Sequence, residues 1–593
     1  MNSKILYPIS IALLFFCLSM NAENRVTERV FVHTDKNSYI AGEDILLKFY
    51  VVDGYFHPSV LSKVGYVEIS DTNRPHMQLM LALENGRGAG VISIPRDIPT
   101  GIYQLSAYTR YMRNEGKNVF FRKQIAIVNP AQQFLDAERF ELVDEFRIEE
   151  RGTAHSTRNQ PINLRVQTDR NEYGNREKVL LSIDNIPENT ANLVVSVSRN
   201  DSIVLVPKVN KEEWFYQAKN AFPFSNEWLP EYEGHIITGH FSPRHQENLV
   251  ASVAFVGDDI RFFNGQINPQ NGLISFYTAG IFGRQQIVTS AIASQGDERV
   301  LFHVDLLSPF CETLPETLPV LQIYPNEQQI MDRFIGVQIQ ERMNSDRNNF
   351  VPTPRYSVLQ PAMTYDLEEY TRFNTISETI LEFVSGVRVT RLRDRSRIIS
   401  LFMEDLQRNS LRTLILLDGI PIFDHEDILA YNPMHIRRID IYNEHYVFGG
   451  RDFEGIISFV THDANLPFFQ LSDESQLLIY NMPQLSPLFE FADYSTETAQ
   501  NSRKPDFRHT LYWNPFVEIT AGKPIELSFY TSDLSGEFKI TVEGFTNDGK
   551  IIQGVYYFHV TASAVSLNSH LLSNELSEIR VFAPLQYYRN CHQ

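Results

Sequence analysis

Two segments of this 593-residue chain, beginning at Val32 and at Val166, repeat one pattern. When residues 32–49 are aligned with residues 166–183, eight of the eighteen positions are identical. The spacing between the two copies indicates duplicated domains, because the units of solenoids are only about 20–50 residues long. Each copy places a polar turn and a tyrosine before an alternating apolar strand, which is typical of a β-sandwich. The sequence therefore predicts two related sandwiches.

Asp35 and Asp169 occupy equivalent places in the turns of the two copies. An aspartate at such a place can bind calcium or act in catalysis, but it more often caps its own turn by accepting backbone N–H groups. We therefore expect both aspartates to be turn caps.

These residues resemble the macroglobulin-like domains of the α-macroglobulin family, in which β-sandwiches follow one another in series. The resemblance covers about residues 26–130 and, for the second copy, about residues 160–208. Members of that family that trap proteases covalently carry a Cys-x-Glu-Gln thioester motif, whereas Cys311 is followed by Glu-Thr-Leu and the motif occurs nowhere in the chain. We therefore do not predict covalent trapping. The residues that carry the resemblance are Thr34, Asp35, Lys36, Tyr39, Gly42, Glu43, the strand 45–51, Gly101, Ile102 and Tyr103.

Residues 1–22 have the order of a signal peptide, in which Lys4 precedes an apolar run that ends at the small residue Ala22. The run is too short to span a bilayer comfortably. We therefore predict an exported, periplasmic protein.

The net charge of the chain, −19, disfavours nucleic acid as a partner. Three cysteines cannot form a disulfide framework, and only Cys311 and Cys591 remain as one candidate pair after the signal peptide is removed.

Between residues 366 and 465 the pattern changes to a small α+β unit. An amphipathic helix over residues 375–383, with Ser377 as a candidate N-cap, is followed by short apolar strands. The unit resembles the plug domain of TonB-dependent outer-membrane receptors, most specifically at residues 416–422 and 455–461. A receptor of that kind needs a barrel of about 22 strands after its plug. The sequence that follows Thr461 is too short for so many strands, so we expect no receptor barrel in this chain.

The sequence patterns in the rest of the chain are also typical of β-strands. Strands between residues 231 and 317 indicate a third sandwich, and Asn547-Asp548-Gly549 between two alternating runs indicates a hairpin in the tail. The whole order resembles exported proteins of Bacteroidota that combine macroglobulin-like and plug domains. The predicted fold is mainly β, with tandem macroglobulin-like β-sandwiches, a small α+β plug-like domain and a C-terminal β-sandwich. The predicted segments are 1–22 (signal peptide), 23–135, 136–230, 231–317, 318–365 (connector with a helix near 327–343), 366–465 (plug-like) and 466–593.

No catalytic, metal-binding or cofactor-binding motif stands out in the sequence, and we predict neither an enzyme nor a cofactor. His425-Glu426 lacks the second histidine of a zinc helix, because Leu429 occupies that place. The acidic pairs Asp258-Asp259 and Glu149-Glu150 are expected to be solvated. His235 and His240 are expected on the surface, on opposite faces of a strand, where they cannot share a metal.

Two features suggest binding to a partner. Trp513 is either a core residue or an exposed aromatic anchor. A dense basic run is either a solvated loop or a docking patch for lipid headgroups or an acidic partner. This run consists of Arg388, Arg391, Arg393, Arg395 and Arg397.

The sequence therefore favours a non-enzymatic envelope protein that recognises other proteins. The plug-like unit is expected to dock on an outer-membrane barrel supplied by another chain, with peripheral membrane association, and exposed strand edges offer β-augmentation as a second mode of contact. The alternative is a macroglobulin-type module that binds proteases or peptides noncovalently.

Overall fold

The computed structural model is mainly β, as predicted. The predicted signal peptide, Glu149-Glu150 and Cys591 lie outside the described residues. Within the described ranges, no helix is long and apolar enough to cross a membrane. The structure describes residues 26–131, 139–143, 161–201, 204, 222–241, 249–268, 270–295, 298–302, 304–324, 327–343, 359–403, 408–410, 413–448, 451–471, 475–520 and 523–561.

The first β-sandwich packs a three-stranded sheet, in the order β1-β3-β6, against a five-stranded sheet, in the order β2-β8-β7-β4-β5. Apolar side chains from both sheets, including those of Tyr39, Phe49 and Tyr66, meet in one core. The strands are β1 (Arg29–Thr34), β2 (Ser38–Ile40), β3 (Asp44–Val52), β4 (Val64–Ser70), β5 (Pro75–Ala82), β6 (Arg87–Ser93), β7 (Gly101–Thr109) and β8 (Phe121–Val128).

Both copies of the sequence repeat form the same turn. The hydroxyl of Tyr39 donates to Asp35 Oδ1 at 2.8 Å, and that of Tyr173 donates to Asp169 Oδ1 at 2.7 Å. The same carboxylate oxygen accepts the backbone N–H eleven residues farther along the chain, at 3.2 Å in the first copy and 2.9 Å in the second. The two aspartates therefore fix the turn through the tyrosine hydroxyl and through an N–H of a following strand, rather than through the N–H groups of their own turn as we expected.

The second repeat and the C-terminal part form one sandwich, although we predicted separate sandwiches at 136–230 and 466–593. Strand β14 lies between β36 and β34, and β13 pairs with β35. Their side chains share one core. We call this unit the composite sandwich. Its strands are β10 (Ile162–Asn163), β11 (Arg165–Thr168), β12 (Glu172–Tyr173), β13 (Lys178–Asp184), β14 (Thr190–Arg199), β34 (Thr510–Asn514), β35 (Ile525–Tyr530), β36 (Gly536–Thr546) and β37 (Ile551–Val560).

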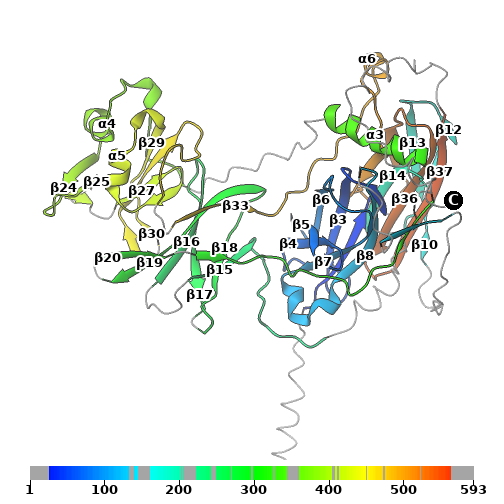
Figure 1. The fold of residues 1–593 in the computed structure, drawn as a ribbon, viewed down its shortest axis with the longest axis horizontal. Helices are drawn as coiled ribbons and strands as arrows, with labels where there is room; N and C mark the ends of the chain where they lie inside the picture. The colour runs from blue at the N-terminus through cyan, green and yellow to red at the C-terminus, as the bar shows by residue number, and fades with distance from the viewer. Residues whose placement is uncertain are drawn as a thin grey trace, which may run out of the picture.

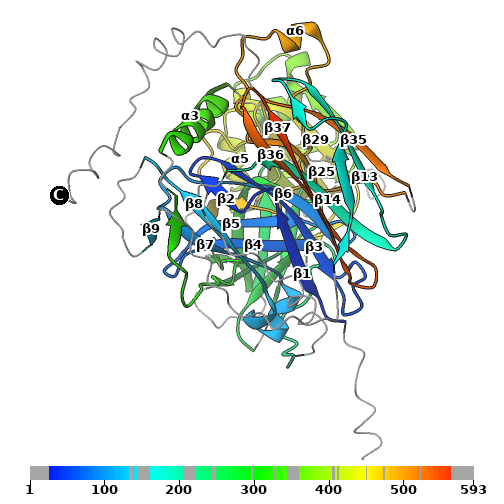
Figure 2. The same cartoon turned by 90° about the vertical axis from the view of Figure 1, so that its right-hand side faces the viewer.

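The predicted hairpin at residues 547–549 is confirmed, since it joins the antiparallel strands β36 and β37. Gly549 has a φ of 78°, which favours glycine at this turn position. Figure 1 shows the composite sandwich beside the first sandwich at one end of the molecule, and Figure 2 shows the same neighbours from the side.

The third β unit is one eight-stranded sheet in the order β20-β19-β16-β17-β18-β15-β21, with β33 added against β19. Strand β33 (Gln476–Asn481) follows the α+β unit in the sequence, so the chain returns to complete a sheet that begins with β15, far earlier in the sequence. The other strands are β15 (Ile236–Phe241), β16 (Leu249–Phe255), β17 (Phe262–Ile267), β18 (Ile274–Tyr277), β19 (Arg284–Gln295), β20 (Glu298–Phe302) and β21 (Val304–Leu306).

The α+β unit has a five-stranded sheet in the order β23-β29-β32-β27-β28, in which β27 and β32 are parallel. A second, three-stranded sheet has the order β24-β25-β26. Helix α4 begins after Thr375, which forms a capping box with Glu378, so Thr375 and not Ser377 is the N-cap. The elements are β23 (Met363–Asp366), α4 (Ile376–Phe383), β24 (Val387–Arg391), β25 (Arg397–Met403), β26 (Arg408–Ser410), β27 (Thr413–Leu417), β28 (Ile420–Ile422), α5 (His425–Ala430), β29 (Ile436–Tyr442) and β32 (Gly455–Thr461).

Helix α3 (Glu327–Met343) occupies the stretch where a helix was expected within the connector. It inserts Arg333 beside the first sandwich, with Nε 2.8 Å from Glu43 Oε1 and Nη1 3.4 Å from Asp201 Oδ2. All three side chains are less than a tenth exposed. A buried charge cluster therefore joins α3, the first sandwich and the end of β14.

Candidate binding surfaces

The predicted basic run forms an antiparallel hairpin of β24 and β25. The strand register places Arg391 opposite Arg397, so the arginines gather at the tip of the hairpin. The turn is closed by the N–H of Leu392, which donates to the carbonyl of Ser396 at 2.8 Å. Arg395 adopts a φ of 80° within this turn. We call residues 388–397 the arginine hairpin, and all five of its arginines are exposed.

Only one of the five arginines is neutralised by a carboxylate among the residues that the structure describes. Arg397 Nη2 lies 2.6 Å from Glu426 Oε2, and this hydrogen bond raises the pKa of Arg397. Arg388 instead lies over the ring of Phe402, with 4.6 Å between the guanidinium carbon and the ring centroid. The structure thus brings the predicted arginines together and leaves four of them with their charge turned to solvent.

Trp513 is only 2% exposed, so it is not a surface anchor. It lies on β34 with its ring 6.4 Å, edge to face, from the ring of Phe489. Strand β34 pairs with β14, and alternate side chains of a strand point to opposite faces of its sheet. The core interpretation is therefore the correct one, and the partner-binding interpretation of Trp513 is wrong.

His235 is buried, with an exposure of 2%, in contrast to our expectation of a surface residue. Its Nδ1 lies 2.9 Å from Glu231 Oε1, and its Nε2 lies 2.9 Å from the hydroxyl of Tyr480. The hydroxyl of Tyr66 also lies 2.8 Å from Glu231 Oε1. This network connects the first sandwich, the third unit and β33, which explains its burial, because the covering residues come from distant parts of the sequence.

The other residues considered for chemistry have structural contacts. His425 Nδ1 accepts the backbone N–H of Ile399 at 3.0 Å, and the carbonyl of Asp258 accepts Arg438 Nη2 at 3.1 Å. Cys311 is half-buried, and burial raises the pKa of its thiol. Among the described residues, no group of three or more His, Cys, Asp or Glu side chains is arranged to hold a metal ion.

No protein-family model matches the chain, and no curated protein matches it. Among solved structures, the alpha-2-macroglobulin of Escherichia coli aligns with 90% of this chain at 8% identity and a TM-score of 0.23. A Salmonella alpha-2-macroglobulin aligns with 91% at 9% identity and a TM-score of 0.21. This chain covers 40% of the length of each of these two proteins.

A third similar structure is the Yersinia pseudotuberculosis adhesin InvE, which aligns with 48% of this chain at 13% identity and a TM-score of 0.14, over 61% of the adhesin chain. TM-scores this low do not establish a common arrangement of domains. The macroglobulin-like interpretation of the sandwiches therefore rests on the sequence repeat and on the turn that both copies form.

Proposed function

We propose that this chain is a non-enzymatic envelope protein that recognises other proteins, and that its α+β unit docks on an outer-membrane barrel complex that serves assembly, secretion or uptake. The observation that carries the proposal is the arginine hairpin, which presents four arginines without carboxylate partners among the described residues of an acidic chain. Charge of this kind favours an acidic protein surface and speeds the encounter with it. The envelope location rests on the signal-peptide pattern of residues 1–22.

The two stretches that most resemble a receptor plug, residues 416–422 and 455–461, lie side by side and are joined by hydrogen bonds. They form the turn between β27 and β28 and the parallel strand β32. The carboxylate of Asp418 in that turn accepts the N–H and the hydroxyl of Thr461, both at 2.7 Å, and the N–H of Leu466 at 2.8 Å. The resemblance therefore concerns residues that form one structural unit.

The α+β unit packs closely against the third unit at Gly419. Gly419 has a φ of 78°, and a Cβ placed there would lie 2.9 Å from the carbonyl oxygen of Asp259 and 3.0 Å from that of Phe255. Figure 1 shows β24 and β25 at the end of the α+β unit that lies away from the first sandwich. This arrangement supports a docking role, because the hairpin lies at an end of the unit where its arginines are exposed.

The test is capture of partners from native envelopes in mild detergent, followed by mass spectrometry. The tagged full chain is compared with a variant in which Arg388, Arg391, Arg393 and Arg395 are replaced by glutamine. The matched control replaces four exposed cations of the composite sandwich by glutamine and so changes the net charge equally. These four are Arg165, Lys178, Arg503 and Lys504.

We expect the parent and the control to capture the same barrel protein and the hairpin variant to lose it. Equal capture by all three proteins would refute the role of the hairpin. Capture of proteases or peptides in place of a barrel protein would favour the alternative, a noncovalent macroglobulin-type binding module.

A further inference from the structure

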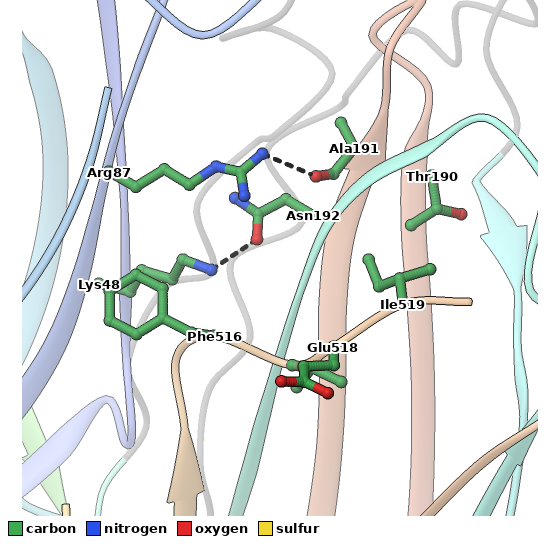
Figure 3. A pocket seen from close by; sticks show the side chains of 9 residues that line it. Lys48, Arg87, Thr190, Ala191, Asn192, Phe516, Glu518 and Ile519 are labelled. Carbon is green, nitrogen blue, oxygen red and sulfur yellow. Dashed lines mark hydrogen bonds between the residues drawn. The ribbon is translucent and has the colours of Figure 1, made fainter. Parts of the chain in front are cut away.

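A cavity of about 390 Å³ lies between the first sandwich and the composite sandwich. Figure 3 shows that Lys48 and Arg87 extend into the same space from the first sandwich, and that Asn192 and Phe516 face them from the composite sandwich. Strand β3 carries Lys48 and strand β6 carries Arg87, and these strands are neighbours in one sheet. Pairing of β3 with β6 therefore places two cations at one wall of the cavity.

The ammonium of Lys48 is buried without an anionic partner among the described residues. Its Nζ donates to Asn192 Oδ1 at 2.5 Å and lies 3.4 Å from the carbonyl oxygen of Leu193. It also lies 4.4 Å from the ring centroid of Tyr50 and 5.0 Å from that of Phe516. All four neighbours are neutral, and they lessen the cost of burying the ammonium without supplying a countercharge.

Arg87 adds a second positive charge to the same wall. Its Nη2 donates to the carbonyl of Ala191 at 3.1 Å, and this acceptor is also neutral. Burial and the nearby charge of Arg87 together lower the pKa of Lys48 well below its ordinary value. Glu518 also lines the cavity, but it is exposed and makes no ion pair within the described part of the chain. No carboxylate of the described residues therefore pairs with either of the two cations.

The remaining wall is mixed, because it carries apolar side chains together with the carboxylate of Glu518 and the hydroxyl of Thr190. Phe516, Val517 and Ile519 line it from one short segment that follows β34. A volume near 390 Å³ is at the small end of the range in which ligand pockets are found. A carboxylate between Lys48 and Arg87 would form charge-assisted hydrogen bonds with both, while an apolar body would contact the opposite wall.

We propose that this cavity binds a small organic carboxylate with an apolar body. Lys48 and Arg87 bind the carboxylate, and Phe516, Val517 and Ile519 contact the body. The same chemistry belongs to a free small acid and to the C-terminal residue of a peptide. This site is separate from the arginine hairpin and does not depend on the proposed function.

The test is calorimetric titration of the full chain with N-acetyl-leucine and with N-acetyl-leucinamide, which has the same body but no charge. We expect saturable binding of the acid and at least about tenfold weaker binding of the amide, because charge-assisted hydrogen bonds are the strong ones. The variants Lys48→Met and Arg87→Gln should each weaken the binding of N-acetyl-leucine by at least about tenfold. Lys63→Met, which removes an exposed lysine of the first sandwich, should leave binding unchanged.

Equal binding of acid and amide would overturn the proposal, as would the absence of binding at millimolar acid. Undiminished binding by a folded Arg87→Gln protein would also overturn it, and this variant keeps the test decisive if Lys48→Met fails to fold. An acetylated peptide that ends in leucine distinguishes the sources. Tighter binding of that peptide than of N-acetyl-leucine supports a peptide C-terminus, and tighter binding of the small acid supports a free acid.

Discussion

The substitution Arg333→Met would remove the cation that holds the buried charge cluster together. Arg333 binds Glu43 with two nitrogens, Nε and Nη2, each at 2.8 Å, and also donates to the carbonyl of Ser38 at 3.0 Å. Methionine approximates the apolar stem of the side chain. The change therefore leaves the packing largely intact and isolates the loss of charge.

The expected cost follows from the burial of the carboxylates that remain. Removing one partner of a buried ion pair costs about 3–5 kcal/mol, because the other charge is left unpaired in a poorly solvated place. In the variant, Glu43 still has one cationic partner, because Lys36 Nζ lies 3.3 Å from its carboxylate. We therefore expect Arg333→Met to lower the free energy of unfolding by about 3 kcal/mol at neutral pH.

The pH dependence gives this prediction a second signature. Burial alone would raise the pKa of Glu43, but the charges of Arg333 and Lys36 outweigh burial and hold that pKa well below its usual range. A lowered pKa stabilises the folded state at pH values above about 4.3, which is the pKa of a glutamate in the unfolded chain. This stability is lost as the pH falls from that value through the pKa of Glu43 in the folded state. Without Arg333, burial dominates and Glu43 binds a proton more readily, so the difference between parent and variant should shrink in acid.

The measurement is urea-induced unfolding of both proteins between neutral and acid pH, with hydrogen exchange to locate the change at α3. In a Glu43→Gln background, Arg333→Met should cost about 2 kcal/mol less, which is the coupling between the two side chains. The matched control is Arg397→Met, which breaks an exposed pair with Glu426 and should change little. A loss below about 0.5 kcal/mol at neutral pH, or a difference that grows in acid, would refute the reasoning.

Four further substitutions test other parts of the account. Tyr39→Phe and Tyr173→Phe each remove the hydroxyl that binds the turn aspartate, and each should lower the free energy of unfolding by about 1 kcal/mol in urea titrations. Gly419→Ala places a Cβ against backbone carbonyls at a positive φ, so hydrogen exchange should quicken where the α+β unit meets the third unit. Trp513→Ala should cost about 3–5 kcal/mol if the side chain is a core residue, and a cost below about 1 kcal/mol would contradict its burial.

The sequence predicts features that are encoded locally. The turns of the repeat depend on an aspartate, a tyrosine four residues later and a strand, all within one short segment. The hairpin at Gly549 is equally local, whereas the sequence pattern places the N-cap of α4 at Ser377 although Thr375 forms the capping box. The mainly β fold could be predicted for the same reason, because alternation along each strand shows that it has a buried face.

The partner of each strand could not be predicted in this way. Alternation in β14 shows which residues face a core but does not show that β36, from the far end of the described sequence, lies beside it. The burial of His235 and of Lys48 depends in the same way on Tyr480 and Asn192, which come from other units. The arginine hairpin could be located in advance because exposed charge needs no partner from elsewhere in the chain.

The central claim, that the arginine hairpin contacts a partner protein, is tested most directly by site-specific photocrosslinking in native envelopes. A photoreactive amino acid replaces Arg393 at the hairpin tip, and the matched control replaces the exposed Val555 on β37. We predict one discrete crosslinked product that contains an outer-membrane barrel protein at position 393 and none at position 555. The absence of any product at position 393, or the same products at both positions, would contradict the account.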